Sequence, residues 1–221
     1  MSFKTKKYQL IKNAIPKLQA EFLYRYILNK RDVAAYLFKS KYISPYTQHW
    51  GWWGDKQVPN TYAHYSDIAM ETILDDLTPL IEKKTQLKLI PNYTYTRIYK
   101  KGDVLKRHKD RYSCEVTGTL SLGGAPWPIY IEPNKNIGFP PAPPARYVPT
   151  NNKGIKVDLT PGDLFLYYGC AMEHWRESFE GEACGQVFLH YTKKGTKKAN
   201  ENAFDDRPFL GLPKDVDRLK K

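Results

Sequence analysis

The spacing of hydrophobic positions changes part-way along this chain. Up to residue 86 the apolar side chains recur every three or four residues, which predicts amphipathic helices over residues 13–39 and from Ser66 to Ile81. Asn13 is placed to cap the first helix ahead of Pro16, and Pro79 is expected to kink the second. The apolar faces consist of Leu18, Phe22, Tyr26 and Ile27 in the first helix and of Met70, Ile73, Leu74, Leu77 and Ile81 in the second.

After residue 87 the hydrophobic period falls to two. The segment "NYTYTRIYK" alternates three tyrosines and Arg97 with threonines and an isoleucine, as expected of a strand. Further short segments rich in β-branched and aromatic residues follow: CEVTGTLSL, WPIYIE, GIKVDL, DLFLYYG and CGQVFLHY. This spacing predicts a sandwich or barrel of antiparallel strands that is preceded by two helical segments.

Two segments between these elements have the composition of loops. The first, "SPYTQHWGWWGDKQVPN", holds Trp50, Trp52 and Trp53, which we expect to fill a core beneath the loop rather than to line a substrate groove. The second is the proline-rich stretch 138–149, which cannot join a central sheet. We expect it to form an exposed loop, with a lid over the site as the alternative.

Charge and cysteine content bear on the binding partners and the cellular location of the protein. The net charge of +12 could attract nucleic acid, an acidic protein or a small anion, although basic chain ends are usually solvated surface. The three cysteines lack a CxxC pattern and indicate a reducing, cytoplasmic location. No apolar run approaches the ~18 residues of a membrane-spanning helix, so we expect a soluble protein with no membrane partner. The oligomeric state is left open.

A histidine and a carboxylate stand two positions apart in "HKDRYSCE". His108 and Asp110 follow a predicted strand, and His174 ends the segment "PGDLFLYYGCAMEH" much later in the chain. Two histidines and one carboxylate of this kind form the facial triad of non-haem Fe(II) oxygenases, which leaves coordination positions open for a co-substrate and O₂. The lysines and arginines beside His108 would disfavour its protonated form and attract an anionic co-substrate.

Other histidines and carboxylates are weaker candidates for metal binding. We expect packing or surface roles for His49 and His64, and a hydrogen bond within the barrel for His190. Glu115, Glu132 and Asp163 are rival carboxylates, but only Asp110 has a histidine at the right offset. The sequence therefore predicts a metal site made of His108, Asp110 and His174.

The same segments resemble the 2-oxoglutarate- and Fe(II)-dependent oxygenases of the prolyl 4-hydroxylase-like group. "RIYKKGDVLKRHKD" is similar to that group's Y-x-x-G-x-x-L-x-x-H-x-D, and "PGDLFLYYG" is similar to the strand that leads to its distal histidine. The resemblance covers roughly residues 66–192. It implies a mainly β fold with N-terminal helices, a double-stranded β-helix (jelly-roll, cupin-like). On this basis residues 1–221 form one domain: helical support over 1–86, the jelly-roll core over 87–192 and a basic tail over 193–221.

The chain departs from the group where 2-oxoglutarate is usually anchored. Most members carry an Arg or Lys about ten residues after the distal histidine, whereas this chain has Cys184, Gly185 and Gln186 there. A dicarboxylate in a water-poor barrel still needs a cation for its far end. We expect Arg176 to supply it, because it shares a strand face with His174 if that stretch is extended.

Three further expectations concern the residues around this anchor. Tyr99 and Gln186 should add hydrogen bonds to the co-substrate. Arg97 is the rival anchor, on the same face of its own strand as Tyr99. Alternatively, Arg176 pairs outside the barrel with Glu177 or Glu180 and binds no co-substrate.

The resemblance implies hydroxylation of a C–H bond with Fe(II), 2-oxoglutarate and O₂, and makes ascorbate a candidate further cofactor. A peptide or protein side chain is the expected substrate, with free amino acids and other small molecules open. Oxidative demethylation of nucleic acid is an alternative that the net charge favours, but no base-flipping or arginine-rich signature accompanies the strands. A non-catalytic jelly-roll binding module is the third possibility.

Overall fold

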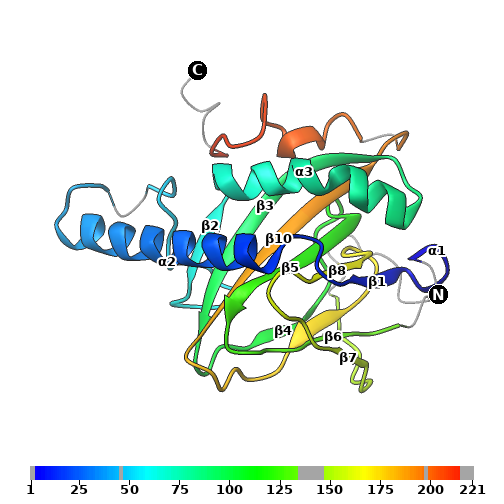
Figure 1. Ribbon diagram of the computed structural model, residues 1–221, viewed down its shortest axis with the longest axis horizontal. Helices are drawn as coiled ribbons and strands as arrows, with labels where there is room; N and C mark the ends of the chain where they lie inside the picture. The colour runs from blue at the N-terminus through cyan, green and yellow to red at the C-terminus, as the bar shows by residue number, and fades with distance from the viewer. Residues whose placement is uncertain (1–2, 45–46, 134–146, 197–198, 215–221) are drawn as a thin grey trace.

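The computed structural model describes residues 3–44, 47–133, 147–196 and 199–214 (Figure 1). Its strands form two antiparallel sheets, as predicted, in a double-stranded β-helix. The six-stranded sheet has the order β1-β8-β5-β10-β3-β2, and the four-stranded sheet has the order β4-β9-β6-β7. The larger sheet comprises β1 (Tyr8–Ile11), β2 (Tyr62–Tyr65), β3 (Leu89–Lys100), β5 (Val116–Gly124), β8 (Leu164–Tyr167) and β10 (Ala183–Lys193). The smaller comprises β4 (Leu105–His108), β6 (Ile129–Ile131), β7 (Ile155–Val157) and β9 (His174–Arg176).

The helices pack on the outer face of the larger sheet. These are α2 (Lys17–Lys39) and α3 (Ile68–Thr85), while the short α1 (Phe3–Lys6) precedes β1 (Figure 1). Because side chains alternate along a strand, Val187 and Leu189 of β10 face the helices, whereas Phe188 and His190 face the interior of the barrel. The helix side of the sheet is thus aliphatic, and the inner side is available for polar groups.

The buried face of α2 differs from the prediction. Leu18 and Phe22 are exposed, and Leu23 and Ile27 are buried together with small alanines. The helix begins after Pro16, which occupies the N-cap position without a side-chain hydrogen bond, so Asn13 is not the cap. By contrast, α3 is capped by Asp67, whose carboxylate accepts from the Met70 amide at 3.2 Å, and its predicted apolar face is buried. It continues through Pro79 as one helix.

The aromatic loop before β2 packs partly against the helices. The Trp53 ring lies 5.0 Å from that of Tyr62 and 5.8 Å from that of Phe38, whereas Trp50 is partly exposed. The prediction of core filling therefore suits Trp53 but not Trp50. The proline-rich stretch lies largely outside the described residues, and residues 147–149 at its end have no regular structure.

The segment after β10, expected to belong to a basic tail, folds back over α3 and β3 in its described part. Arg207 is buried and donates to both carboxylate oxygens of Glu71, at 2.8 and 3.1 Å, and to the carbonyl of Asn92 at 2.9 Å. A short 3-10 helix, Ala203–Asp205, brings the carboxylate of Asp205 to the barrel. The segment thus contributes a buried ion pair to the structure.

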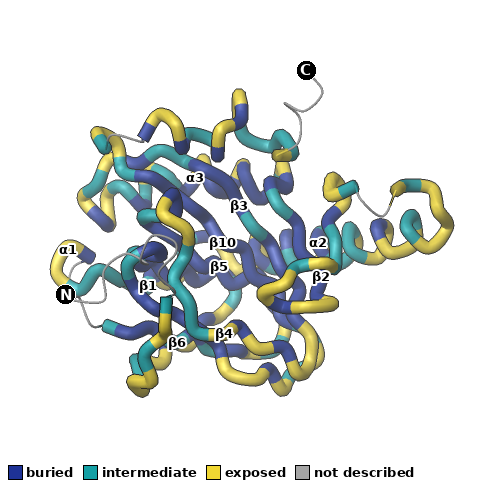
Figure 2. Tube along the Cα trace, turned by 180° about the vertical axis from the view of Figure 1, so that it is seen from behind, coloured by how far each residue is buried: buried dark blue, intermediate teal, exposed yellow. Residues whose placement is uncertain are grey.

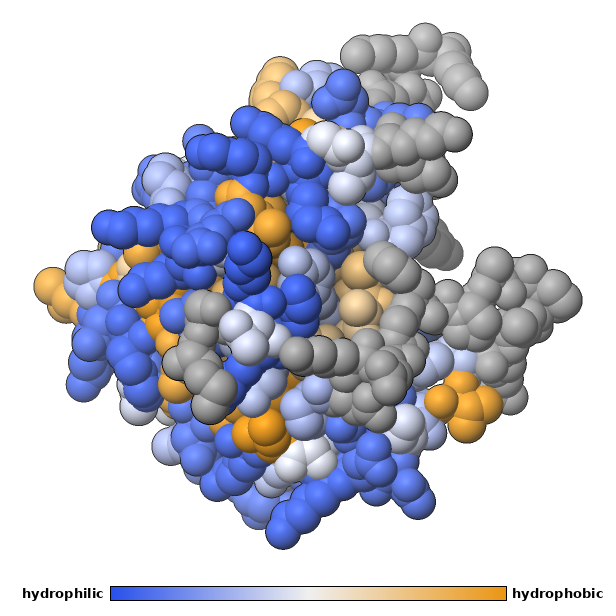
Figure 3. Space-filling model, turned by 90° about the vertical axis from the view of Figure 1, so that its right-hand side faces the viewer, coloured by the Kyte–Doolittle hydropathy of each residue, from blue (hydrophilic) through white to orange (hydrophobic). Residues whose placement is uncertain are grey.

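Burial concentrates on the central strands, as Figure 2 shows for β3, β5 and β10. The face in Figure 3 is largely hydrophilic, with small hydrophobic patches between charged side chains. The three cysteines are buried and form no disulfide. Within the described residues, no helix has the length and apolar character needed to span a membrane.

Candidate metal centre

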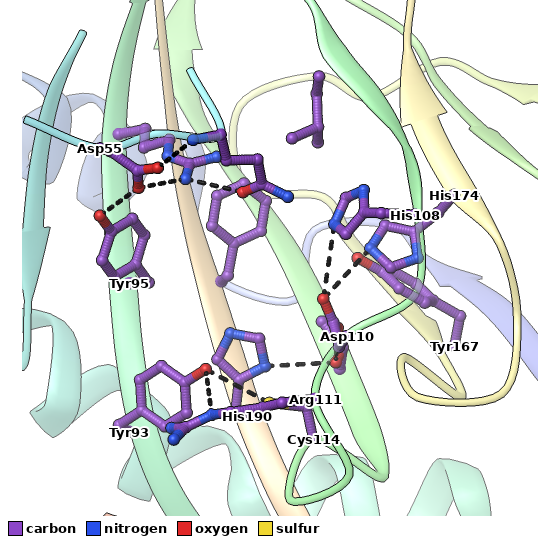
Figure 4. A pocket seen from close by; sticks show the side chains of 15 residues that line it. Asp55, Tyr93, Tyr95, His108, Asp110, Arg111, Cys114, Tyr167, His174 and His190 are labelled. Carbon is purple, nitrogen blue, oxygen red and sulfur yellow. Dashed lines mark hydrogen bonds and ion pairs between the residues drawn. The ribbon is translucent and has the colours of Figure 1, made fainter. Parts of the chain in front are cut away.

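The structure brings His108, Asp110 and His174 together at one end of the smaller sheet. His108 ends β4 and lies directly opposite His174, the first residue of β9. The Nε2 atoms of the two histidines are 3.6 and 3.5 Å from the same oxygen, Oδ1 of Asp110 (Figure 4). Their potential ligand atoms all lie within 4.8 Å of one another, and this is the one such cluster among the described residues.

Backbone carbonyls orient both imidazole rings. Nδ1 of His108 lies 2.7 Å from the carbonyl oxygen of Lys106, and Nδ1 of His174 lies 3.1 Å from that of Met172. A carbonyl oxygen can only accept a hydrogen bond, so each ring donates from Nδ1, and the lone pair of Nε2 is the one that can bind a metal. Hydrogen bonds of this kind typically fix the ligand tautomer at metal sites.

The Asp110 carboxylate is held on its other side. Its Oδ2 accepts from the Thr117 hydroxyl at 2.7 Å, and its backbone amide donates to the Gly169 carbonyl at 2.9 Å. Gly169 is required for this approach, because a Cβ there would lie 2.2 Å from Oδ2 and 2.1 Å from the Thr117 oxygen. Oδ1 therefore points at the two histidines.

The charge states at this cluster suit a divalent cation. Burial opposes ionisation of Asp110, but the adjacent imidazoles of His174 and His108 hold the pKa of its carboxyl well below the ordinary value. Burial and the neighbouring His174 lower the pKa of His108, which favours its neutral form. The sequence predicts that the surrounding lysines and arginines lower the pKa of His108, whereas in the structure burial and His174 are the main causes.

The donor set fits Fe(II). Two imidazole nitrogens and one carboxylate oxygen lie within 4.8 Å of one another, and two histidines with one carboxylate are the ligand set of the non-haem iron facial triad. The rival carboxylates are used elsewhere: Glu115 pairs with Lys193, and Asp163 pairs with Lys12. His64 is buried against the His49 carbonyl at 2.9 Å, and Glu132 faces Arg107 at 3.9 Å.

A cavity of about 250 Å³ opens beside the cluster. One wall comes from β3, whose inward side chains include Tyr93, Tyr95 and Arg97. His190 of β10 also lines it; its ring stacks on Tyr93 at 4.4 Å and its Nδ1 lies 3.3 Å from the Thr117 hydroxyl. Burial lowers the pKa of His190 to about 4, so this histidine is neutral at pH 7.

Arg97, the rival anchor, already has a counter-ion. One of its nitrogens, Nη2, donates to Oδ2 of Asp55 at 2.5 Å and to Oε1 of Gln57 at 2.8 Å. Tyr95 donates to the same Asp55 oxygen at 2.5 Å. Although burial opposes ionisation, Arg97 and Tyr95 lower the pKa of the Asp55 carboxyl. The positive charge of Arg97 is therefore neutralised within the protein.

Arg176 has no such partner in the described part of the chain. Its side chain is fully buried, and the carbonyl oxygen of Trp127 accepts from Nη1, while no described residue bonds to Nε or Nη2. Burial lowers its pKa because desolvation disfavours the charged form. The alternative of a surface ion pair with Glu177 or Glu180 is therefore wrong.

Arg176 lies farther along the barrel than the histidine cluster. It is opposite Leu105 in the β4–β9 pairing, whereas His174 is opposite His108. Two residues of a strand span about 7 Å and share a face. Tyr99 is fully buried, and its hydroxyl lies 3.5 Å from Nη1 of Arg97.

Gln186, the other predicted co-substrate residue, is buried on β10. Its Nε2 donates to the Cys184 sulfur at 3.2 Å, and its Oε1 has no partner. Burial raises the pKa of Cys184, and the nearby Arg176 opposes this rise. Arg176 and Gln186, which both have unsatisfied polar atoms, thus both lie near Cys184, and neither of them lines the cavity beside the histidine cluster.

Sequence reasoning missed several cavity residues that lie outside the motif. Asp55 and Gln57 come from the aromatic loop, and Asp205, which accepts from the cavity residue Arg111, comes from the segment after β10. Arg111 lies inside the segment HKDRYSCE, but the sequence distinguishes it from none of the other cations around His108. The alternation of "NYTYTRIYK" was the signal that could have assigned Tyr93 and Tyr95 to the wall.

Comparison with solved structures identifies the fold. No protein-family model and no curated protein sequence matches this chain. A Pseudomonas putida prolyl-4-hydroxylase superposes with a TM-score of 0.56, over 87% of this chain and 96% of its own, at 14% identity. The fold is that of 2-oxoglutarate- and iron-dependent oxygenases.

Two other solved structures show how varied the proteins of this fold are. HygX from Streptomyces hygroscopicus, with nickel and 2-oxoglutarate bound, gives a TM-score of 0.56 at 12% identity, over 93% of this chain and 94% of its own. SnoN, a non-haem α-ketoglutarate-dependent epimerase from nogalamycin biosynthesis, gives 0.57 at 11% identity, over 96% and 88%. Identities this low establish the shared fold and leave the reaction to be argued from the site.

Proposed function

We propose that this protein is a 2-oxoglutarate- and Fe(II)-dependent oxygenase that hydroxylates a C–H bond. The observation that carries the proposal is the combination of a His-Asp-His cluster with a fully buried arginine one step along the same strand. An uncompensated guanidinium in a barrel is costly unless an anion binds it. A dicarboxylate that reaches from the metal to Arg176 would provide that anion.

Each residue has a defined part in this proposal. His108, Asp110 and His174 would hold Fe(II), which supplies the oxidising chemistry once O₂ and 2-oxoglutarate are bound. Arg176 would pair with the far carboxylate, and Tyr99 and Gln186 would bond to it from neighbouring strands. The balanced reaction consumes 2-oxoglutarate, O₂ and R–H and yields succinate, CO₂ and R–OH.

The solved structures that share the fold support this reading in general terms. One of them contains nickel and 2-oxoglutarate, and another is a prolyl-4-hydroxylase. Because an epimerase is also among them, hydroxylation rests on our reading of the site. Our sequence-based prediction for the substrate is a peptide or protein side chain.

The proposal is tested by loading purified protein with Fe(II) and 2-oxoglutarate without O₂. We expect a weak visible absorption band from the metal–2-oxoglutarate complex, and succinate formation after O₂ is admitted. The variant Asp110→Ala should lose both signals and remain folded. If the folded parent protein shows no band and forms no succinate, the binding-module alternative is favoured.

Substrate class is tested in the same assay. Succinate formation is measured in the presence of peptides, free amino acids or methylated oligonucleotides. Stimulation by oligonucleotides alone would favour oxidative demethylation. Added ascorbate shows whether a reductant sustains turnover.

A further inference from the structure

Arg111 presents an unused edge to the cavity. It follows Asp110 directly and lines the cavity near Tyr93 and His190 (Figure 4). Its guanidinium carbon lies 4.4 Å from the centre of the Tyr93 ring, its Nε donates to the Tyr93 hydroxyl at 3.3 Å, and its Nη2 donates to Asp205 at 2.6 Å. These contacts fix the plane of the guanidinium. The Cys114 thiol also interacts with the guanidinium, but no described oxygen accepts from Nη1, and the side chain is 38% exposed.

Charge is balanced elsewhere in the cavity but not at Arg111. Arg97 is neutralised by Asp55. On the proposed function, Fe²⁺, the Asp110 carboxylate, the 2-oxoglutarate dianion and the cation of Arg176, which lies deeper in the barrel and does not line the cavity, sum to zero. Asp205, the partner of Arg111, also pairs with Lys214 at 3.3 Å. One carboxylate therefore faces two cations, and a single positive charge is left over at this end.

We infer that the substrate carries a carboxylate that pairs with Arg111, and is a carboxylic acid of about the size of an amino acid. This inference rests on the proposed function and departs from the prediction of a peptide side chain. The free Nη1 and the second hydrogen of Nη2 form a planar fork that matches a carboxylate. The single surplus charge also suits a carboxylate better than a phosphate dianion.

Size and position agree with this class. A cavity of about 250 Å³ accepts a small molecule, and most of the side chains that line it are polar or charged, which suits a polar substrate. Arg111 lines the same cavity as His108, Asp110 and His174, so a small substrate whose carboxylate binds Arg111 lies in the cavity onto which the proposed metal site opens. The tyrosine side chains along β3 would then contact its carbon skeleton.

Binding rather than turnover provides the test. Proline, lysine, asparagine and leucine are each offered as the free acid, as the primary amide and within a peptide blocked at both ends. Binding to the metal-free protein and to the anaerobic protein with Fe(II) and 2-oxoglutarate is measured by calorimetry. We expect at least one free acid to bind and its amide to bind roughly 10- to 100-fold more weakly, as for the loss of a charged hydrogen bond.

Variants assign that binding to Arg111. Arg111→Gln should weaken binding of the free acid by a similar factor and leave the affinity for 2-oxoglutarate unchanged. Arg111→Lys keeps the charge, loses the planar fork and should also weaken binding, which covers the case in which the glutamine variant does not fold. Lys101→Gln removes an exposed charge outside the cavity and should bind like the parent.

Three results would overturn the inference. The first is equal binding of acid and amide, the second is binding of blocked peptides or oligonucleotides with no binding of any free acid, and the third is a loss of 2-oxoglutarate affinity in Arg111→Gln. The absorption band of the Fe(II)–2-oxoglutarate complex separates this inference from the proposed function. If the band persists, only the substrate class is wrong.

Discussion

Replacement of Arg176 by methionine tests the co-substrate site most directly. Methionine has a similar length and carries no charge, and Arg176 is the largest fully buried side chain of the described protein. Two of its nitrogens, Nε and Nη2, are free to bond a carboxylate. Truncation of one partner of a buried charge pair costs about 2–5 kcal/mol, so the Kd for 2-oxoglutarate should rise roughly 30- to several-thousand-fold.

The same change should affect stability in the opposite sense. In the protein without 2-oxoglutarate the guanidinium is an unpaired buried charge, with only the Trp127 carbonyl as an acceptor. Removal of that charge offsets the loss of one hydrogen bond, which is worth about 1 kcal/mol. We expect the free energy of unfolding of Arg176→Met without ligand to equal or exceed that of the parent. Added 2-oxoglutarate should stabilise only the parent.

Arg97→Met is the matched control. It leaves Asp55 without its arginine, and loss of one member of a buried pair costs about 3–5 kcal/mol of stability. Titration of the absorption band gives the Kd for 2-oxoglutarate, and urea unfolding gives the stability. If Arg176→Met retains the parent affinity and Arg97→Met loses it, the anchor is Arg97 and our account of the pocket fails.

Three further predictions concern the metal, pH and the segment after β10. His174→Ala should bind iron far more weakly than the parent, whereas His190→Ala should retain metal affinity; the reverse result in equilibrium dialysis would make His190 the distal ligand. Burial lowers the pKa of His64 to about 4, so the stability that its neutral form provides is complete above about pH 6.5 and is lost as pH falls toward 4. The loss is about 3 kcal/mol, and a His64→Gln variant should show a correspondingly smaller decline in urea unfolding between these pH values. Arg207→Met should lower the free energy of unfolding by about 3–5 kcal/mol, because Glu71 is then buried without its partner; an unchanged value would mean that the pair contributes no net stability.

The parts of the site that could be predicted are those whose residues follow a short, regular spacing in the sequence. His108 and Asp110 lie at a fixed offset, and period-two alternation gives the face of each side chain on a strand. The same parity placed Arg176 on the face of His174, and the structure puts both in β9 with buried side chains. The relative orientation of side chains along one strand can therefore be predicted without knowledge of the rest of the fold.

The helix faces were less predictable, because burial depends on which surface a helix meets. Leu18 and Phe22 fit the apolar period of α2, yet they are exposed. The sheet contacts the side of the helix that carries Leu23 and Ile27. A periodic pattern predicts that a helix forms, and it selects a face only where one stripe is clearly the most apolar.

The counter-ions of the cavity arginines come from segments with no recognisable motif. Asp55 is 42 positions from its partner Arg97, and Asp205 is 94 positions from Arg111. Separations of this size leave no local spacing to detect. They nevertheless decide the charge at each end of the cavity, since Asp55 serves one arginine and Asp205 is shared between Arg111 and Lys214.

The net charge of the chain is consequently a poor guide to its substrate. A value of +12 favoured nucleic acid at the level of composition. Inside the cavity, however, the charge depends on how many cations pair with each buried carboxylate, and on the proposed function the surplus there would be a single positive charge at Arg111. Because a buried ion pair carries no free charge to a ligand, the cations that matter for recognition are those whose counter-ion is shared or missing. By this criterion Arg176 would select the co-substrate and Arg111 would select the substrate. Arg97, which is paired with Asp55, would only hold the β3 wall of the cavity in place.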